Sequence, residues 1–162
     1  SLKDIKKVDY FSKIANIEQQ VFLFEDTLKN NLTLYKEHSD QEIADAIRRA
    51  GLEDFVSQHA DGLGRKIVDN GKNISGGEKS RIAIARGLLN KAEIIFLDEA
   101  FASLDLDKAR AIERSVLALE NVTVINVSHV IIKENLDQYD EVITVKNQKV
   151  WIRELASASA AN

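Results

Sequence analysis

Three short runs rich in apolar residues, separated by helical patterns, most constrain the fold of this chain. The runs cover residues 14–17, 92–97 and 122–127, and none of them alternates regularly between apolar and polar residues. Strands without such alternation are typical of a parallel sheet that is buried on both faces. The pattern therefore predicts an α/β fold in which helices cover both faces of a parallel sheet.

Capping residues mark the helices between these runs. Ser39 and Glu42 have the spacing of a capping box, in which the hydroxyl and the carboxylate each accept a hydrogen bond from a free backbone N–H. An apolar stripe follows and ends before Gly51, a residue type common at helix stops. Further helices are expected over 52–59, 75–90 and 107–119.

The remaining segments are predicted to form a loop, a hairpin and a tail. Residues 60–73 hold three of the seven glycines and are expected to form a loop around a short strand. Residues 141–145 and 149–152 are predicted to pair through a turn at Asn147. The small and polar residues 156–162 are expected to form a flexible tail.

The composition excludes several classes of protein. The 162 residues are 44% hydrophobic and 30% charged with a net charge of −4, which is typical of a globular protein and argues against nucleic-acid binding. No apolar run approaches the ~18 residues that a membrane helix needs. The absence of cysteine excludes disulfides, thiolate metal sites and cysteine nucleophiles. The absence of proline, where about eight would be expected at average usage, favours an edited sequence.

Two adjacent acids, Asp98 and Glu99, follow the apolar run at 94–97. A buried parallel strand delivers its carboxyl end to the ligand-binding edge of the sheet. Two carboxylates at that edge can divide the work, one lying near Mg²⁺ and the other orienting or deprotonating water. The alternative interpretation is an ordinary strand end with two solvated acids.

The segment Ser75-Gly76-Gly77-Glu78 opens the helix expected over 75–90. Capping-box spacing explains the serine and the glutamate. It does not explain two glycines in the first turn, each of which costs about 1 kcal/mol relative to alanine. Their missing side chains allow close approach to free N–H groups, so a phosphate site at this helix N-terminus is favoured over a simple cap.

His129 and Gln19 gain meaning only from their places in the chain. His129 follows the run at 122–127, so it is expected at the same sheet edge as Asp98. Gln19 follows the first run. Taken alone, each would be interpreted as a structural or surface residue.

The order of these motifs resembles the ATP-binding cassette (ABC) ATPase family over nearly the whole chain up to Trp151. Residues 74–78 resemble the family's signature motif, and residues 94–99 resemble the Walker B strand with its catalytic acid. Residues 102–105 match the D-loop, His129 matches the switch histidine, and Gln19 matches the Q-loop glutamine. The implied fold is the parallel-sheet core of a P-loop NTPase with the α-helical subdomain of this family.

The resemblance implies a role in ATP hydrolysis for four residues. Asp98 would hold Mg²⁺ through water, and Glu99 would polarise the attacking water as the general base. His129 would contact the γ-phosphate. Gln19 would sense both Mg²⁺ and the water.

The resemblance also implies a head-to-tail dimer with a second nucleotide-binding domain. Ser75, Gly76 and Gly77 would cap the γ-phosphate of a nucleotide held by the opposite protomer, and Glu78 completes that motif. Asp105 would help to organise the dimer contact.

Two segments resemble those of exporter-type domains. Phe22-Leu23-Phe24 after Gln19, and Asp69-Asn70-Gly71 before the signature motif, are expected to contact the transmembrane domain of an exporter, which places the parent protein at the cytoplasmic face of the cell membrane. The alternative for Phe22, Leu23 and Phe24 is a place in the core, although their clustering in a loop favours an interface. One alternative is a soluble ABC ATPase that does not act in transport. Another is a non-catalytic or engineered module that uses the fold as a scaffold or donates only the signature motif.

The chain departs from the family in having no P-loop. It contains no Gly-x-x-x-x-Gly-Lys-Ser/Thr, and no glycine precedes residue 51. That loop supplies the backbone cradle and the lysine for the β- and γ-phosphates. We therefore expect a C-terminal portion of the domain over 1–155, with a helical subdomain at about 25–90 and core at about 1–24 and 91–155. This portion is expected to bind ATP poorly alone, and residues 122–127 to form an apolar edge strand.

Overall fold

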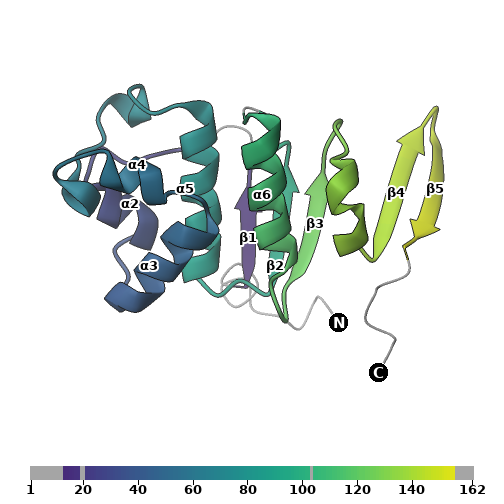
Figure 1. Cartoon of the computed structure of the whole chain (residues 1–162), viewed down its shortest axis with the longest axis horizontal. Helices are drawn as coiled ribbons and strands as arrows, with labels where there is room; N and C mark the ends of the chain where they lie inside the picture. The colour runs from purple at the N-terminus through teal and green to yellow at the C-terminus, as the bar shows by residue number, and fades with distance from the viewer. Residues whose placement is uncertain (1–12, 19–20, 103, 156–162) are drawn as a thin grey trace, which may run out of the picture.

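A parallel three-stranded sheet forms the centre of the molecule. The computed structural model describes residues 13–18, 21–102 and 104–155 (Figure 1). Strands β1 (Ile14–Ile17), β2 (Ile94–Asp98) and β3 (Thr123–Val127) are hydrogen-bonded in the order β1-β2-β3. Both pairings are parallel. The α/β fold and these strand positions therefore agree with the sequence pattern.

Helices occupy the connections between the strands. The connection from β1 to β2 holds α2 (Leu28–Thr33), α3 (Asp40–Arg49), α4 (Glu53–Ser57), the 3-10 turns η2 (Gly62–Gly64) and η3 (Asp69–Gly71), and α5 (Gly76–Leu89). Helix α6 (Leu106–Leu117) connects β2 to β3. Figure 1 shows the helices from α2 to α5 gathered at one end of the molecule.

Among the described residues helices cover one face of the sheet, where two covered faces were expected. A Cβ added at Gly87 of α5 would lie 3.0 Å from the Ala15 Cβ of β1, and Glu113 of α6 accepts a hydrogen bond from Asn126 of β3. Within the described residues, the opposite face of β3 leaves Ile125 and Val127 exposed. Right-handed crossovers that add parallel strands in one direction place both connections on the same face, so the covering of the other face requires a different segment.

Local capping determines where α3 and α5 begin. The predicted capping box at Ser39 and Glu42 is present, and Gly51 follows α3 with a φ of 64°. The short helix expected over 52–59 is α4. The strand expected within 60–73 is wrong, because that segment contributes only one isolated antiparallel bridge, between Lys66 and Thr27.

The end of the described chain forms an antiparallel hairpin of β4 (Glu141–Lys146) and β5 (Lys149–Glu154), preceded by the 3-10 segment η4 (Lys133–Gln138). Asn147 and Gln148 form the turn with φ values of 50° and 59°, which confirms the predicted position of the turn. Most apolar side chains of the hairpin are exposed. The tail predicted at 156–162 lies outside the described residues.

No helix in the described part of the chain is both long enough and apolar enough to cross a membrane.

Candidate functional site

Asp98, Glu99 and His129 lie together at the carboxyl edge of the sheet. Asp98 ends β2 in register with Val127 of β3. The Glu99 N–H then donates to the Val127 carbonyl at 3.0 Å, and the Glu99 carboxylate accepts from the His129 N–H at 3.0 Å. The parallel pairing therefore brings the two acids and the histidine to one place, as their positions after the strands predicted.

The side chains at this edge are directed outward. The His129 side chain is 96% exposed, and its Nε2 lies 3.6 Å from Glu99 Oε1. The Asp98 side chain is exposed, and its carboxylate makes no hydrogen bond or ion pair to any described residue. Glu99 has a φ of 50°, a conformation that costs a non-glycine residue about 1 kcal/mol or more. Eight other non-glycine residues of the described chain, among them Leu34 and Lys91, also have a positive φ, so this conformation alone does not set Glu99 apart.

Asp105 is the N-cap of α6. Its carboxylate accepts a hydrogen bond from the Lys108 N–H at 3.0 Å, and the Lys108 ammonium lies 3.3 Å away. The pKa of Asp105 is lowered, first by the hydrogen bond from the Lys108 backbone. Within the chain this residue therefore acts as a helix cap.

Ser75 and Glu78 form the second capping box, at the start of α5. The Glu78 carboxylate accepts from the Ser75 N–H and hydroxyl at 2.8 Å each, and the Glu78 N–H donates to the Ser75 hydroxyl at 3.3 Å. The hydrogen bonds of the Glu78 carboxylate are thus used in the helix cap. Gly76 is exposed at the helix N-terminus. Among the described residues, no hydrogen bond or ion pair joins this motif to Asp98, Glu99 or His129.

Asp98 could bind Mg²⁺, and the first turn of α5 could bind a phosphate, but neither site is complete within the described residues. Asp98 offers the carboxylate oxygen that Mg²⁺ prefers, in an exposed position. No cluster of three metal-ligating side chains occurs in the described residues, so any Mg²⁺ here would take most of its ligands from water or substrate. The first turn of α5 offers N–H groups to a phosphate, but the sequence lacks the P-loop that cradles a triphosphate.

An exposed aromatic group, here called the aromatic patch, consists of Phe22, Phe24 and Tyr35. The rings of Phe22 and Phe24 meet edge to face at 5.3 Å, and those of Phe24 and Tyr35 lie 6.2 Å apart. Their exposed fractions are 60%, 37% and 63%. Leu23 is fully buried, so its expected contact with a partner is wrong and it belongs to the core. Gln19 lies outside the described residues.

The two segments predicted to contact a membrane partner lie next to each other. The Leu23 N–H donates to the Asn70 Oδ1 at 2.8 Å. Gly71, with a φ of 70°, allows this approach, because a Cβ there would lie 2.7 Å from Leu23 Cδ1. Residues 21–24 and 69–71 therefore form one surface.

Sequence reasoning missed the pair formed by the buried Asn31 and the half-buried Arg86. Asn31 is fully buried and bonds both backbone groups of Phe24. Arg86 donates to the Asn31 carbonyl at 2.6 Å, and burial lowers its pKa to about 10. The available signal was a cation placed directly after four consecutive residues, 82–85, that are too apolar for an exposed helix face.

Sequence reasoning also missed Glu113, a buried carboxylate that anchors both sides of the segment carrying His129. It accepts from Asn126 at 3.0 Å, from the Tyr139 hydroxyl at 2.8 Å and from Asn135 at 2.6 Å. Burial is the first cause of the raised pKa of Tyr139. The signal for Glu113 was its inward helical spacing with Ala109 and Val116.

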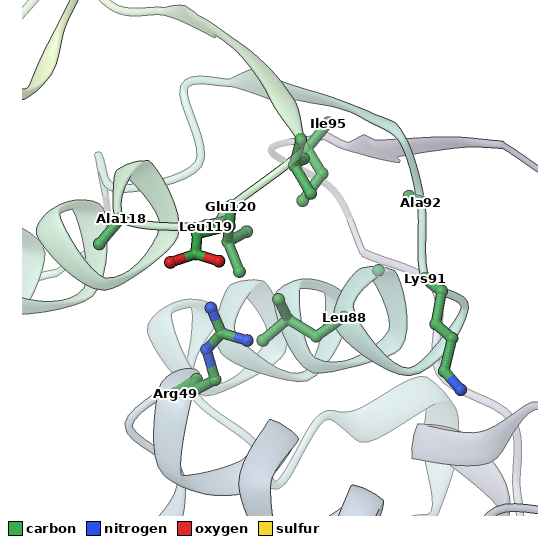
Figure 2. A pocket seen from close by; sticks show the side chains of 10 residues that line it. Arg49, Leu88, Lys91, Ala92, Ile95, Ala118, Leu119 and Glu120 are labelled. Carbon is green, nitrogen blue, oxygen red and sulfur yellow. The ribbon is translucent and has the colours of Figure 1, made fainter.

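A cavity of about 410 Å³ opens at the opposite edge of the sheet, where β2 and β3 begin. It is lined by both apolar and charged side chains, which include Leu88, Ile95 and Lys91. Figure 2 shows Arg49 and Glu120 pointing towards one another at its side. This cavity lies away from Asp98 and forms no part of the candidate site.

Comparison with known protein families gives one match that covers more than half of the chain. The sequence profile described as "ABC transporter" matches residues 2–102. This range includes Ser75, Asp98 and Glu99.

Curated relatives are bacterial proteins named "ATP-dependent lipid A-core flippase". The chain is 34% identical over 142 residues to the protein of Francisella novicida, covering 86% of the chain and 24% of the relative. It is 34% identical over 152 residues to that of Vibrio cholerae, covering 92% and 26%. The chain thus spans about a quarter of the length of these relatives.

A solved structure described as that of "a bacterial Atm1-family ABC exporter with ATP bound" resembles the fold. The TM-score is 0.78 at 25% identity, over 89% of this chain and 25% of the other.

Proposed function

Since the chain belongs to the ABC transporter family, we propose that it is part of the nucleotide-binding domain of an exporter, in which ATP hydrolysis drives transport. The observation that carries the proposal is the grouping of Asp98, Glu99 and His129 at one sheet edge, with Glu99 bonded to the His129 backbone at 3.0 Å. The likeness to exporters of this family supports the same conclusion.

Three residues at this edge would act on the γ-phosphate and the attacking water. Mg²⁺, when bound with ATP, would neutralise charge on the phosphates. Asp98 would hold it through water, and Glu99 would take the proton of the attacking water as general base. His129 would contact the γ-phosphate, and its exposed side chain is free to reach a ligand.

Gln19 would complete this group of residues by sensing Mg²⁺ and the water. It follows β1, which pairs with β2 along the same sheet. Its role rests on the resemblance to the Q-loop alone.

The start of α5 would serve a nucleotide held by a second domain in a head-to-tail dimer. Ser75, Gly76 and Gly77 would approach its γ-phosphate, since the helix N-terminus favours negative charge. The Glu78 carboxylate keeps its negative charge, but its two hydrogen bonds from Ser75 hold it at the helix cap. Asp105 would contribute to the same dimer contact from the start of α6.

A transmembrane domain would contact the surface formed by residues 21–24 and 69–71, at the cytoplasmic face of the membrane. The exposed rings of Phe22 and Phe24 support this proposal, because clustered exposed aromatic side chains mark interaction surfaces. The contact between Leu23 and Asn70 supports a single docking surface rather than two.

The 162 residues alone are proposed to bind ATP weakly, because they lack the P-loop. The exposed apolar side of β3 is consistent with a strand and a helix that are supplied from elsewhere. Titration calorimetry with Mg–ATP tests this directly. We expect no binding in the micromolar range, and micromolar affinity of this chain alone would overturn the proposed incompleteness.

Catalysis is tested by adding a P-loop-bearing strand and helix from a relative as a separate polypeptide. We expect ATP hydrolysis to appear in the mixture. Glu99→Gln should lower it by about 10²- to 10⁴-fold, as expected for loss of a general base. Glu93→Gln, at an exposed carboxylate just before β2, is the matched control and should leave the rate unchanged. Equal rates for Glu99→Gln and the unmodified chain would exclude the assigned role of Glu99.

A further inference from the structure

Helix α5 connects the two regions that the proposed function uses. Its first turn carries Ser75 as N-cap, followed by Gly76 and Gly77. Two cationic side chains further along the helix, Lys79 and Arg86, hold the surface formed by residues 21–24 and 69–71. Because they are seven residues apart, they lie on the same face of the helix.

Arg86 makes the main attachment. Its guanidinium donates to the Phe22 carbonyl at 2.8 Å, to the Asn31 carbonyl at 2.6 Å and to the Asn31 Oδ1 at 3.0 Å. It also lies over the Phe24 ring, 5.9 Å from the centroid. One side chain of α5 therefore contacts the backbone of Phe22, the ring of Phe24 and Asn31 of α2.

The chemistry of Arg86 is suited to positioning rather than to charge pairing. Within the described part of the chain no carboxylate lies in ion-pair distance of it, and all three hydrogen bonds go to carbonyl or amide oxygens. Burying a cation without an anion is expensive compared with an apolar side chain. The gain is geometric, because the planar fork of arginine can hold three oxygens in fixed directions.

Lys79 makes the second attachment. Its ammonium donates to the Asn70 carbonyl at 3.0 Å, and the Asn70 Oδ1 in turn accepts from the Leu23 N–H. Lys79 thus holds residues 69–71, while Arg86 holds residues 21–24. The two segments of the docking surface are attached to the same helix at two points.

We propose that Arg86, assisted by Lys79, is a positioning residue that links the aromatic patch to the signature motif through α5, so that a displacement at one end is transmitted to the other. The link itself is a property of this chain. Its meaning for transport rests on the proposed function, and the two are tested separately.

The first experiment measures amide hydrogen exchange in the chain. Ser75→Ala removes a cap at the start of α5, and we expect it to raise the exchange rate of the Phe24 amide several-fold. In an Arg86→Lys background, which keeps the charge but loses the fork, the Phe24 amide should already exchange about tenfold faster, the equivalent of about one hydrogen bond. Ser75→Ala should then add nothing.

Two variants serve as controls in this experiment. Ser39→Ala removes the equivalent cap of α3 and should leave the Phe24 amide unchanged. Lys79→Gln is a milder change at a half-buried side chain and should act on the Leu23 amide, by a smaller factor. Equal effects of Ser75→Ala with and without Arg86 would overturn the link.

The second experiment uses the complete exporter. With Arg86→Lys we expect basal ATP hydrolysis to stay within about twofold, while its stimulation by transported substrate is lost. A purely structural role would lower both rates together, so that outcome overturns the inference, as does full stimulation in the variant. If the unmodified exporter shows no ATP-driven transport, the proposed function fails, while the exchange experiment still decides the link.

Discussion

The helical half, residues 28–90, and the far end of the sheet, residues 123–154, differ in how far their apolar side chains are buried. Leu28, Leu32 and Ile84 in the helical half are fully buried, and the buried amide of Asn31 has partners for all of its polar atoms. At the far end, apolar side chains are widely exposed. They include Ile125, Val127, Ile143, Val145 and Ile152.

The difference shows which of the two regions buries its own apolar side chains without a neighbour. A two-stranded hairpin is marginal in water unless a third strand or a helix covers it. Figure 1 shows β4 and β5 at the end of the molecule, paired with each other and apart from the main sheet. The helical half therefore supplies most of the stability, whereas the far end offers surface for a neighbour.

The largest expected difference is between one isoleucine in each half, buried in the first and exposed in the second. Ile84→Ala, in α5, should lower the free energy of unfolding by about 2–5 kcal/mol, since it creates a cavity at a fully buried site. Ile143→Ala, in β4, removes the same atoms from a side chain that is 59% exposed and should cost less than about 1 kcal/mol. Urea denaturation of both variants measures the two changes. Similar losses would contradict the comparison, because they would mean that the hairpin is as well packed as the core.

The sequence predicted the features that depend on local hydrogen bonds or on the regular pairing of parallel strands. Both capping boxes were predicted because Ser39 and Ser75 bond to groups three residues away. The placement of His129 beside Asp98 followed from parallel pairing alone. Features that depend on distant residues were not predictable in this way.

Helix α2 was missed for a physical reason. Its six residues include two asparagines and a threonine, which have low helix propensity, and tertiary contacts with Arg86 compensate for this. Two covered faces were expected because the apolar runs alone do not reveal on which side the crossovers pass.

Gly71 tests how tightly the helical half is packed, and Gly62 is its control. Both glycines have positive φ values, 70° and 50°, so alanine should cost about 1 kcal/mol at each. At Gly62 nothing lies within 4 Å of the added Cβ, whereas at Gly71 it would meet Leu23 Cδ1 at 2.7 Å. Because Leu23 is fully buried, Gly71→Ala should lose about 1–3 kcal/mol more than Gly62→Ala in urea denaturation. Equal losses would indicate that the core around Leu23 yields easily.

The two capping boxes test whether the helical half also contacts a nucleotide held by a neighbouring domain. Ser39→Ala and Ser75→Ala should each cost about 1 kcal/mol in thermal or urea unfolding, because each removes the same pair of hydrogen bonds. When mixed with an intact P-loop-bearing domain, the unmodified chain is expected to stimulate ATP hydrolysis, and only Ser75→Ala should reduce that stimulation. If both variants reduced the stimulation equally, the effect would come from stability, and the assignment of Ser75 to a neighbouring nucleotide would be wrong.

The smallest expected effect is the acid sensitivity of one contact in the helical half. A hydrogen bond from the Lys91 ammonium, followed by those from the Ser39 N–H and hydroxyl, lowers the pKa of Glu42 to about 2 from 4.5. A carboxyl whose pKa is lowered by folding stabilises the folded state above its unfolded pKa and loses that contribution as the pH falls through the folded value. The contribution of Glu42 should therefore be complete above pH 4.5 and fade towards pH 2.

Glu42→Gln isolates this contribution, because glutamine still completes a capping box but cannot pair with Lys91. The difference between the variant and the unmodified chain in urea midpoint should be greatest near neutral pH and vanish as the pH approaches 2. Since the pair is exposed, added salt should reduce the difference at neutral pH as well. A difference that stayed constant down to pH 2 would place its origin in the helix cap rather than in the charge of Glu42. In that case a lower pH would not reduce the stability of the helical half relative to the far end of the sheet through Glu42.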